Sequence, residues 1–489
     1  MDDSSNIKQK TQRGLLWNML ERMAVYAIQF SVTIYIARIL DPHDFGLIAM
    51  LALFTQLSTI FIDSGFSRAL IQKKNRTETD FSTIFFFNLA ISVLIYIVLF
   101  FSAPIIADYY GEQQLVPIAR ILFINFIISA FNIVPMAKLS IAVDFKTRAI
   151  ITTIATLFSY AAGFVMAISG CGVWTLVFLN ISNTAVTTLL LIIKLRWKPL
   201  LAFSIESFKQ MFNYGWKLLM ASIIAAVSTK IYFMVIGKKF TTEDVGFYDK
   251  GERMPTFVSG SLMTVLQNVS FPIMSEMQND DQRLNNYYRK LIRLCVFCIF
   301  PCMIGFALLA EPLTRFLLTD KWLPAVPFVQ WFCISYLFMP LGSLNTNYLN
   351  AKGDSDMTLL IECIKLPIGL GILFLSLPWG VLGIVIGRAI NSFIGFFVNA
   401  YFPGRMSGYT PWKQLKEMLP TILATLCMAA AVWPIVHFLP TSYDLVKILA
   451  APVVGGGVYY GAAALLRIDE VKDMNALVAG YAKKIFNRG

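Results

Sequence analysis

The sequence IFFFNLAISVLIYIVLFFSAPII, residues 84–106, contains no charged residue and decides the fold class. The hydrocarbon core of a bilayer is about 30 Å thick, and a helix needs about 20 mostly apolar residues to cross it. Similar apolar runs, such as residues 121–136 and 372–398, recur along the 489 residues. The chain is therefore predicted to be an all-α integral membrane protein that crosses the bilayer many times.

The composition excludes several classes of protein. The mean hydropathy is +0.65 and only 14% of residues are charged, whereas a soluble protein carries about 25%. No GxxxxGK[ST] sequence is present, so the chain has no P-loop motor for ATP-driven transport. The seven cysteines do not suggest a disulfide framework, and Cys295, Cys298 and Cys302 are interpreted as packing residues on one helix face rather than metal ligands. We predict no catalytic residue, no metal and no cofactor.

Counting apolar runs between polar breaks predicts 14 spans. They are residues 14–40, 45–66, 83–107, 116–137, 149–169, 172–194, 214–236, 254–274, 290–311, 326–349, 358–377, 380–402, 419–439 and 446–466. The first run is too long for a signal peptide and lacks a cleavage pattern, so it is expected to remain as a span. Gly and Pro at residues 169–172 and 378–380 predict tight turns. Residues 204–213 and 469–487 are amphipathic and are expected to lie along the membrane surface.

These spans are expected to form three parts: an N-terminal six-helix lobe over residues 1–200, a second six-helix lobe over 201–405, and two extra helices with a cytoplasmic tail over 406–489. With the N-terminus inside, the predicted cytoplasmic loops hold 26 of the 41 Lys and Arg residues, the opposite loops hold 8, and 7 lie in the spans. This asymmetry predicts that both termini are cytoplasmic. The net charge of +12 is accordingly attributed to loops that face anionic lipid, not to binding of nucleic acid.

An eleven-residue segment occurs twice. Residues 36–46 read IARILDPHDFG and residues 236–246 read IGKKFTTEDVG. We expect Asp44 and Asp244 to be N-caps or first-turn acids of the next helix. Because six spans separate the copies, the two halves should have the same orientation and be related by an axis along the membrane normal. Two such lobes are expected to enclose a central cavity.

The charges inside the predicted spans indicate the cargo. Each costs about 2.5–3.5 kcal/mol on insertion scales, so it should face an interior or a partner. Seven basic residues against four acids favour an anionic cargo, and Arg suits phosphate oxygens through its planar fork. At their predicted depth, Arg22, Lys230 and Arg388 are expected to line the cavity.

The acids offer few routes for ion coupling. Both histidines, His43 and His437, fall at predicted outer loops or helix edges, so coupling by protons would need Glu21, Asp63 or Glu362. Glu362 lies three residues before Lys365, and this spacing also suits a structural ion pair. Both interpretations of these acids stay open.

Several stretches resemble the Wzx-type polysaccharide flippases of bacteria, in particular the colanic-acid-exporter-like branch of the multidrug/oligosaccharidyl-lipid/polysaccharide exporter superfamily. No single stretch decides this, but their order and the 14-span plan together make the resemblance specific. The stretches are Arg13-Gly14-Leu15-Leu16-Trp17, residues 37–47, residues 63–72, Gly170-Cys171-Gly172-Val173-Trp174-Thr175-Leu176, residues 248–255 and Phe271-Pro272-Ile273-Met274-Ser275.

The resemblance implies two six-helix lobes and two extra helices in the bacterial inner membrane. It implies a cargo, an oligosaccharide on undecaprenyl pyrophosphate, that crosses by alternating access for capsule, exopolysaccharide or O-antigen synthesis. It also implies membrane lipid, a polysaccharide polymerase and glycosyltransferases as partners. The cationic role of the family is carried to Arg22, Lys217, Lys230 and Arg253. Lys230 departs from the acidic or amide residue common in relatives, which puts an ion-coupling role at this position in doubt.

Three alternatives remain at this stage. A multidrug antiporter should have an acid-rich cavity, and a lipid II flippase shares the 14-span plan. A membrane-embedded glycosyltransferase or ligase should carry a large outer loop with catalytic acids or histidines. The longest predicted outer loop here is only residues 237–253.

Overall fold

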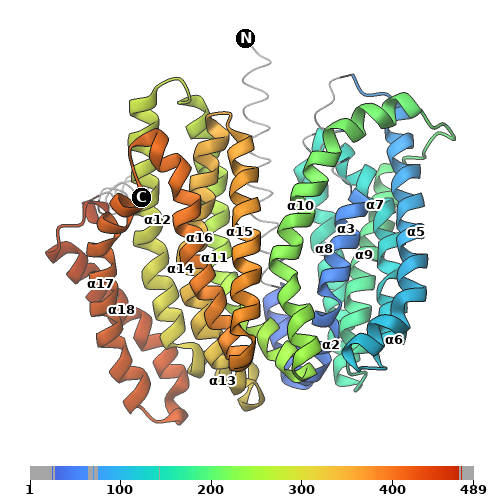
Figure 1. Cartoon of the computed structure of the whole chain (residues 1–489). Coiled ribbons are helices and arrows are strands. Elements are labelled where there is room, and N and C mark those ends of the chain that lie inside the picture. The colour runs from blue at the N-terminus through green and yellow to red at the C-terminus, as the bar shows by residue number, and fades with distance from the viewer. Residues whose placement is uncertain are drawn as a thin grey trace, which may run out of the picture. The chain divides into compact units, whose positions relative to one another are not determined.

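The computed structural model describes residues 25, 28–63, 66, 70, 75–142, 144–472 and 475, without the side chains at 210, 213–215, 217, 218, 221, 261, 262, 264–269, 271, 272 and 355. Every regular element in these residues is a helix (Figure 1). Within them, nine helical segments are long and apolar enough to cross a membrane, or ten if α2 and α3 form one bent span. One segment, Asp356–Ser407, contains two helices, α15 and α16. The chain is an all-α, multi-pass membrane protein, as predicted.

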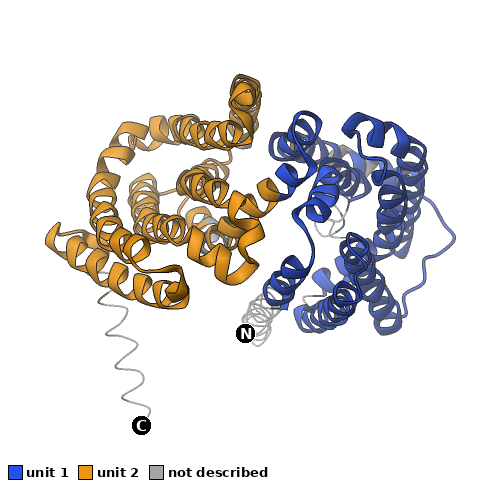
Figure 2. Ribbon diagram, turned by 90° about the horizontal axis from the view of Figure 1, so that it is seen from below, with its two compact units in different colours: residues 1–246 blue, residues 247–489 orange. Residues whose placement is uncertain are grey.

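The helices group into two compact units, residues 1–246 and 247–489 (Figure 2). The first contains α2 (Pro42–Met50), α3 (Ala52–Asp63), α5 (Glu78–Tyr110), α6 (Leu115–Leu122), α7 (Ile124–Ile141), α8 (Phe145–Ile168), α9 (Trp174–Leu195) and α10 (Ile205–Lys239). Next, α11 (Thr242–Glu276) begins in the first unit and continues into the second. The second contains α12 (Asp281–Leu308), α13 (Ala310–Leu318), α14 (Val326–Ala351), α15 (Ser355–Ser376), α16 (Gly380–Ser407), α17 (Pro411–Phe438) and α18 (Asp444–Leu465). Because α10 packs on α3 and α5, it groups with the first unit, and the lobe boundaries at 200 and 405 stay predictions.

Helix α5 shows how the sequence makes a span. Thr77 and Asp80 form a reciprocal capping box at its start, and Gly111 ends it in the left-handed conformation at φ 78°. Phe85 packs against α7, while Phe101 is 72% exposed and Ile105 is 71% exposed. Large apolar side chains this exposed are stable only against lipid, so α5 has one face on the protein and one on the membrane.

The connector from α9 to α10 is attached to the first turn of α5. The Glu78 carboxylate accepts hydrogen bonds from Lys138 Nζ at 2.7 Å and from Trp197 Nε1 at 2.8 Å. The backbone N–H of Leu200 donates to Ser82 Oγ at 2.9 Å. These bonds fix the route by which the chain enters α10.

One expectation about this region was wrong, and another stays a prediction. Residues 204–213 form the start of α10, where the rings of Phe208 and Phe87 are 4.9 Å apart and Met211 is buried, and their position along the membrane surface stays a prediction. Residues 237–253 are not a loop, because α10 ends at Lys239 and α11 begins at Thr242. The charged residues of this stretch suggested a loop, but Thr241 and Asp244 cap each other and start a helix that contains them.

Other features agree with the sequence. Gly170 and Gly172 have φ values of 75° and 53°, and Gly380 has φ 73°, so the predicted turns rely on the left-handed region. The two extra C-terminal helices, α17 and α18, pack on each other and on α12. Tyr459 Oη donates to the Phe297 carbonyl at 2.7 Å and closes this contact.

Candidate functional site

Two of the predicted cationic residues, Arg388 and Arg253, each form an ion pair with an acid of α11 in the second unit. We call this group the α11–α16 cluster and define it as Tyr248, Asp249, Glu252, Arg253 and Arg388. The first four occupy successive turns of α11, and Arg388 projects from α16. Positions 248 and 252, and positions 249 and 253, lie one helical turn apart and therefore share a face in pairs.

Arg388 is buried and compensated. Its Nη2 lies 3.3 Å from Glu252 Oε1, and its Nη1 donates to Tyr248 Oη at 3.2 Å. The side chains of Arg388 and Glu252 are only 14% and 12% exposed. The guanidinium carbon lies 5.6 Å from the centre of the Phe332 ring. An acid, a phenol and an aromatic face thus hold this guanidinium within the second unit.

Arg253 is the exposed member of the cluster. Its Nε lies 2.7 Å from Asp249 Oδ2, but 69% of its side chain is accessible, whereas Asp249 is 7% exposed. Between these pairs, Lys250 is buried with its Nζ 5.5 Å from the centre of the Trp322 ring. Residues 248–253 therefore bring two cations and two carboxylates close together along α11, and only the Arg253 side chain is largely exposed.

This balance decides what the cluster can do. A buried ion pair gains little net stability because desolvation offsets attraction, yet removing one partner costs about 3–5 kcal/mol. Arg388 therefore stays paired with Glu252. An anion can interact with the Arg388 guanidinium by displacing the Glu252 carboxylate or by binding beside it. Arg253 is already exposed, so it can contact an anion without a change in its burial.

Glu362 and Lys365 form an ion pair on α15. Lys365 Nζ lies 2.6 Å from Glu362 Oε1 and 3.4 Å from Asn399 Oδ1 on α16. Both side chains are partly exposed, at 36% and 28%. The spacing of three residues therefore brings these two groups together as the sequence suggested.

The remaining predicted residues belong to the first unit. Lys230 is half-buried on α10, with its Nζ 4.8 Å from the centre of the Phe233 ring. Asp63 is half-buried at the last position of α3, which packs on α10. Arg22, Glu21 and the side chain of Lys217 lie outside the described residues.

The two acids of the cluster, Glu252 and Asp249, are absent from the predicted site. The sequence predicts a loop at these positions, which separates them from the charges of the spans. Their signal was present: Asp249 and Arg253, like Tyr248 and Glu252, have the i, i+4 spacing of a helix face. Extending α11 back to its cap at Thr241 would have exposed this pattern.

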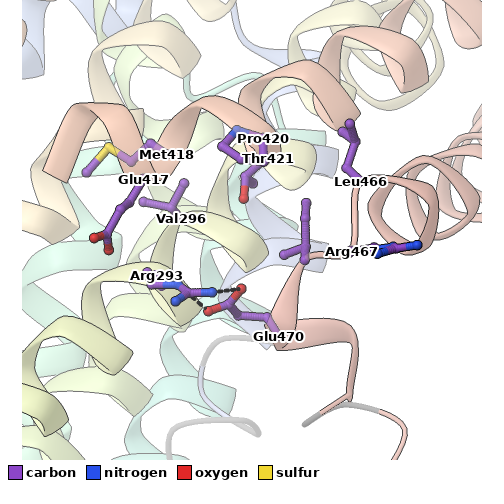
Figure 3. A pocket seen from close by; sticks show the side chains of 10 residues that line it. Arg293, Val296, Glu417, Met418, Pro420, Thr421, Leu466, Arg467 and Glu470 are labelled. Carbon is purple, nitrogen blue, oxygen red and sulfur yellow. Dashed lines mark hydrogen bonds and ion pairs between the residues drawn. The ribbon is translucent and has the colours of Figure 1, made fainter. Parts of the chain in front are cut away.

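A second feature with charged lining is a small pocket between α12, α17 and the turn after α18 (Figure 3). Arg293 points into it and meets Glu470, with 2.8 Å between Nε and Oε1. The pocket has a volume of about 90 Å³. It is too small for a lipid-linked glycan and serves to attach the C-terminal segment to α12.

Among the residues that the structure describes, no group of His, Cys, Asp and Glu side chains could hold a metal ion. Cys295 is buried and Cys298 and Cys302 are exposed on α12.

Comparison with known proteins adds to this geometry. Residues 35–327 match the model of a family described as polysaccharide biosynthesis protein. The chain is 23% identical to the teichuronic acid biosynthesis protein TuaB of Bacillus subtilis, over 83% of this chain and 87% of that protein. It is 23% identical to the lipopolysaccharide biosynthesis protein WzxC of Escherichia coli, over 80% of this chain and 79% of that protein. Among solved structures, the lipid II flippase MurJ in an inward closed conformation shares the fold, with a TM-score of 0.76 at 15% identity over 93% of this chain and 100% of that one.

Proposed function

Because this chain belongs to the polysaccharide biosynthesis protein family, as its sequence motifs suggested, we propose that it exports an oligosaccharide linked to undecaprenyl pyrophosphate across the bacterial inner membrane. The family match covers more than half of the chain, and the relatives bear the names of polysaccharide biosynthesis proteins. The product would enter a capsule, an exopolysaccharide or an O-antigen. Glycosyltransferases would act before this step, and a polymerase would act after it.

The observation that supports a phosphate-bearing cargo is the α11–α16 cluster. It combines an accessible guanidinium, Arg253, with a mostly buried one, Arg388, that is paired with the carboxylate of Glu252. A pyrophosphate carries more charge than a carboxylate and can accept from both faces of an arginine fork. Arg22, Lys217 and Lys230 are proposed to extend the cationic surface along the route.

The proposed mechanism is alternating access with both termini cytoplasmic. The pyrophosphate and glycan pass through a hydrated interior while the polyprenyl chain stays in lipid, because moving it into water would cost about 0.8 kcal/mol per CH₂. Energy would come from an ion gradient acting on Glu21, Asp63 or Glu362. For Glu362 the ammonium of Lys365 would have to release the carboxylate first.

The test is a flipping assay in proteoliposomes with a fluorescent polyprenyl-pyrophosphate oligosaccharide. Arg253→Gln and Lys230→Gln should each lower the rate about ten- to hundredfold, since a charged hydrogen bond contributes about 1.5–3 kcal/mol. Lys472→Gln is the matched control, because Lys472 is 79% exposed beyond α18 and should leave the rate unchanged. Wild-type rates in both cavity variants would refute the cationic route.

The same assay separates the rival cargoes. A lipid II flippase would transport lipid II in preference to the capsule-type substrate, and its loss would stop growth. A multidrug antiporter would move organic cations, and neutralising Arg253 would raise that activity.

A further inference from the structure

The two copies of the eleven-residue repeat contact each other through their glycines. A Cβ atom added to Gly46 would lie 1.9 Å from the carbonyl oxygen of Thr242, and one added to Gly246 would lie 2.0 Å from the carbonyl oxygen of Pro42. Gly46 and Gly246 occupy equivalent positions of the repeat, and so do Pro42 and Thr242. The contact is therefore reciprocal, as at a twofold axis where the same patch meets itself. All four residues belong to the first unit.

Close approach, not backbone conformation, explains these glycines. Neither Gly46 nor Gly246 has a positive φ, so an L-residue could adopt either conformation. Glycine inside a helix costs about 1 kcal/mol relative to alanine. The compensation is that the starts of α2 and α11 touch backbone to backbone, at a separation that any side chain would prevent.

Both helices start with the same local geometry. The N–H of Asp41 donates to Asp44 Oδ2 at 3.3 Å, and the N–H of Thr241 donates to Asp244 Oδ2 at 3.2 Å. Each glycine then follows two residues after its acid. The duplicated sequence thus produces two matching surfaces and not merely two similar loops.

One acid bridges the two helix starts. Glu112, just after α5, has its Oε1 3.4 Å from Nε2 of His43 on α2 and accepts a hydrogen bond from Thr242 Oγ1 on α11. The end of α5 makes a second connection, because Lys238 Nζ donates to the Tyr109 carbonyl at 2.6 Å. These polar links surround a contact whose nearest atoms are the backbone carbonyl oxygens of Thr242 and Pro42.

We propose that this glycine crossing is a closure on the membrane side opposite the N-terminus, formed when that side is shut and separated when it opens. The proposal rests on the alternating-access function given above. A backbone contact held by a few polar groups can separate and form again without repacking a core. The crossing also lies where α11 passes from the first unit into the second, so its separation would be coupled to movement of that helix.

The experiment measures the accessibility of Thr242, which is 6% exposed. Thr242→Cys in a background without the seven native cysteines is labelled from outside with a membrane-impermeant maleimide. Gly46→Ala and Gly246→Ala should each raise the labelling rate about tenfold or more, because the added carbon cannot fit. Gly371→Ala is the control, since its added Cβ would meet nothing within 4 Å.

Reciprocity makes a stricter demand on the double variant. One methyl group already separates the helices, so Gly46→Ala with Gly246→Ala should label no faster than the faster single variant. The closure would be refuted if the increases in labelling rate of the two single variants multiplied in the double variant. It would also be refuted if neither single variant raised the labelling rate. Where alanine prevents folding, Glu112→Gln adds no volume and should also raise the rate; an unchanged rate there would equally overturn it. Labelling requires no cargo. The expected labelling pattern in a protein that does not flip the glycan would therefore refute the proposed function and leave the proposed closure intact.

Discussion

The pairing of Arg388 with Glu252 gives a prediction in which stability and transport can be measured separately. Replacing Glu252 by Met leaves the guanidinium of Arg388 only 14% exposed and without its carboxylate. Breaking a buried pair in this way costs about 3–5 kcal/mol, and Arg388→Met should cost a similar amount by stranding the acid. The double variant removes both charges and fills their space with apolar atoms, so its stability should be equal to or above that of the wild type. The cycle should therefore give a coupling energy of about 6 kcal/mol or more, the sum of the two single costs.

Equilibrium unfolding in mixed detergent and SDS micelles measures the stability part. The matched control is the same cycle with Lys472→Met and Asp469→Met, whose side chains are 79% and 63% exposed and whose coupling energy should be at most about 1 kcal/mol. Flipping in proteoliposomes then measures function, and the stable double variant should still transport poorly because it has lost the buried cation. Single variants that cost less than about 1 kcal/mol would refute the buried ion pair. A double variant with wild-type flipping would instead refute the role of Arg388 in transport while leaving the pair intact.

Two further predictions concern the other ion pairs. Glu362 and Lys365 are partly exposed, so Glu362→Gln should change the unfolding free energy by no more than about 1 kcal/mol; if Glu362 couples transport to protons, the same variant should lose the response of flipping to an imposed pH gradient, and a retained response would exclude it. The pKa of Asp469 lies below its usual 3.8 because Arg293 and then Lys472 donate hydrogen bonds to it. This stabilisation is complete above pH 3.8 and is lost as the pH falls through the lowered pKa. Wild type should therefore exceed Asp469→Asn in melting temperature near neutral pH and approach it in acid; a difference that does not shrink below pH 3.8 would contradict the assignment.

The sequence predicted the transmembrane elements well because bilayer thickness sets their length and composition. Glu78–Tyr110 and Trp174–Leu195 differ by only a few residues from the predicted spans 83–107 and 172–194. The errors came where charges lie on a helix that continues beyond the apolar run. Residues 242–253 are helical because Thr241 and Asp244 cap them, and a hydropathy window does not detect caps.

The candidate site was predictable only where its residues are close in the sequence. The sequence identified Arg388 as a charge inside a span, and the family resemblance added Arg253, but neither indicated that their partners are Glu252 and Asp249. Partners 136 residues apart, such as Glu252 and Arg388, meet only through tertiary packing of α11 on its neighbours. Glu362 and Lys365 were paired correctly because a spacing of three is a local property of a helix.

The carboxylates of the cluster suggest how a transporter with a cationic binding site could release an anionic cargo. An unpaired arginine in a buried site would be costly when the site is empty and would bind phosphate too tightly when it is full. A carboxylate beside each guanidinium lowers both the free-energy cost of the empty site and its affinity for phosphate. The incoming pyrophosphate must displace the carboxylate, and the returning carboxylate helps to expel the pyrophosphate. On the proposed function, Asp249 and Glu252 are therefore as necessary to turnover as Arg253 and Arg388 are to binding. It follows that Asp249→Asn, which removes the carboxylate paired with the exposed Arg253, should tighten cargo binding and slow its release, the opposite of the effect of Arg253→Gln.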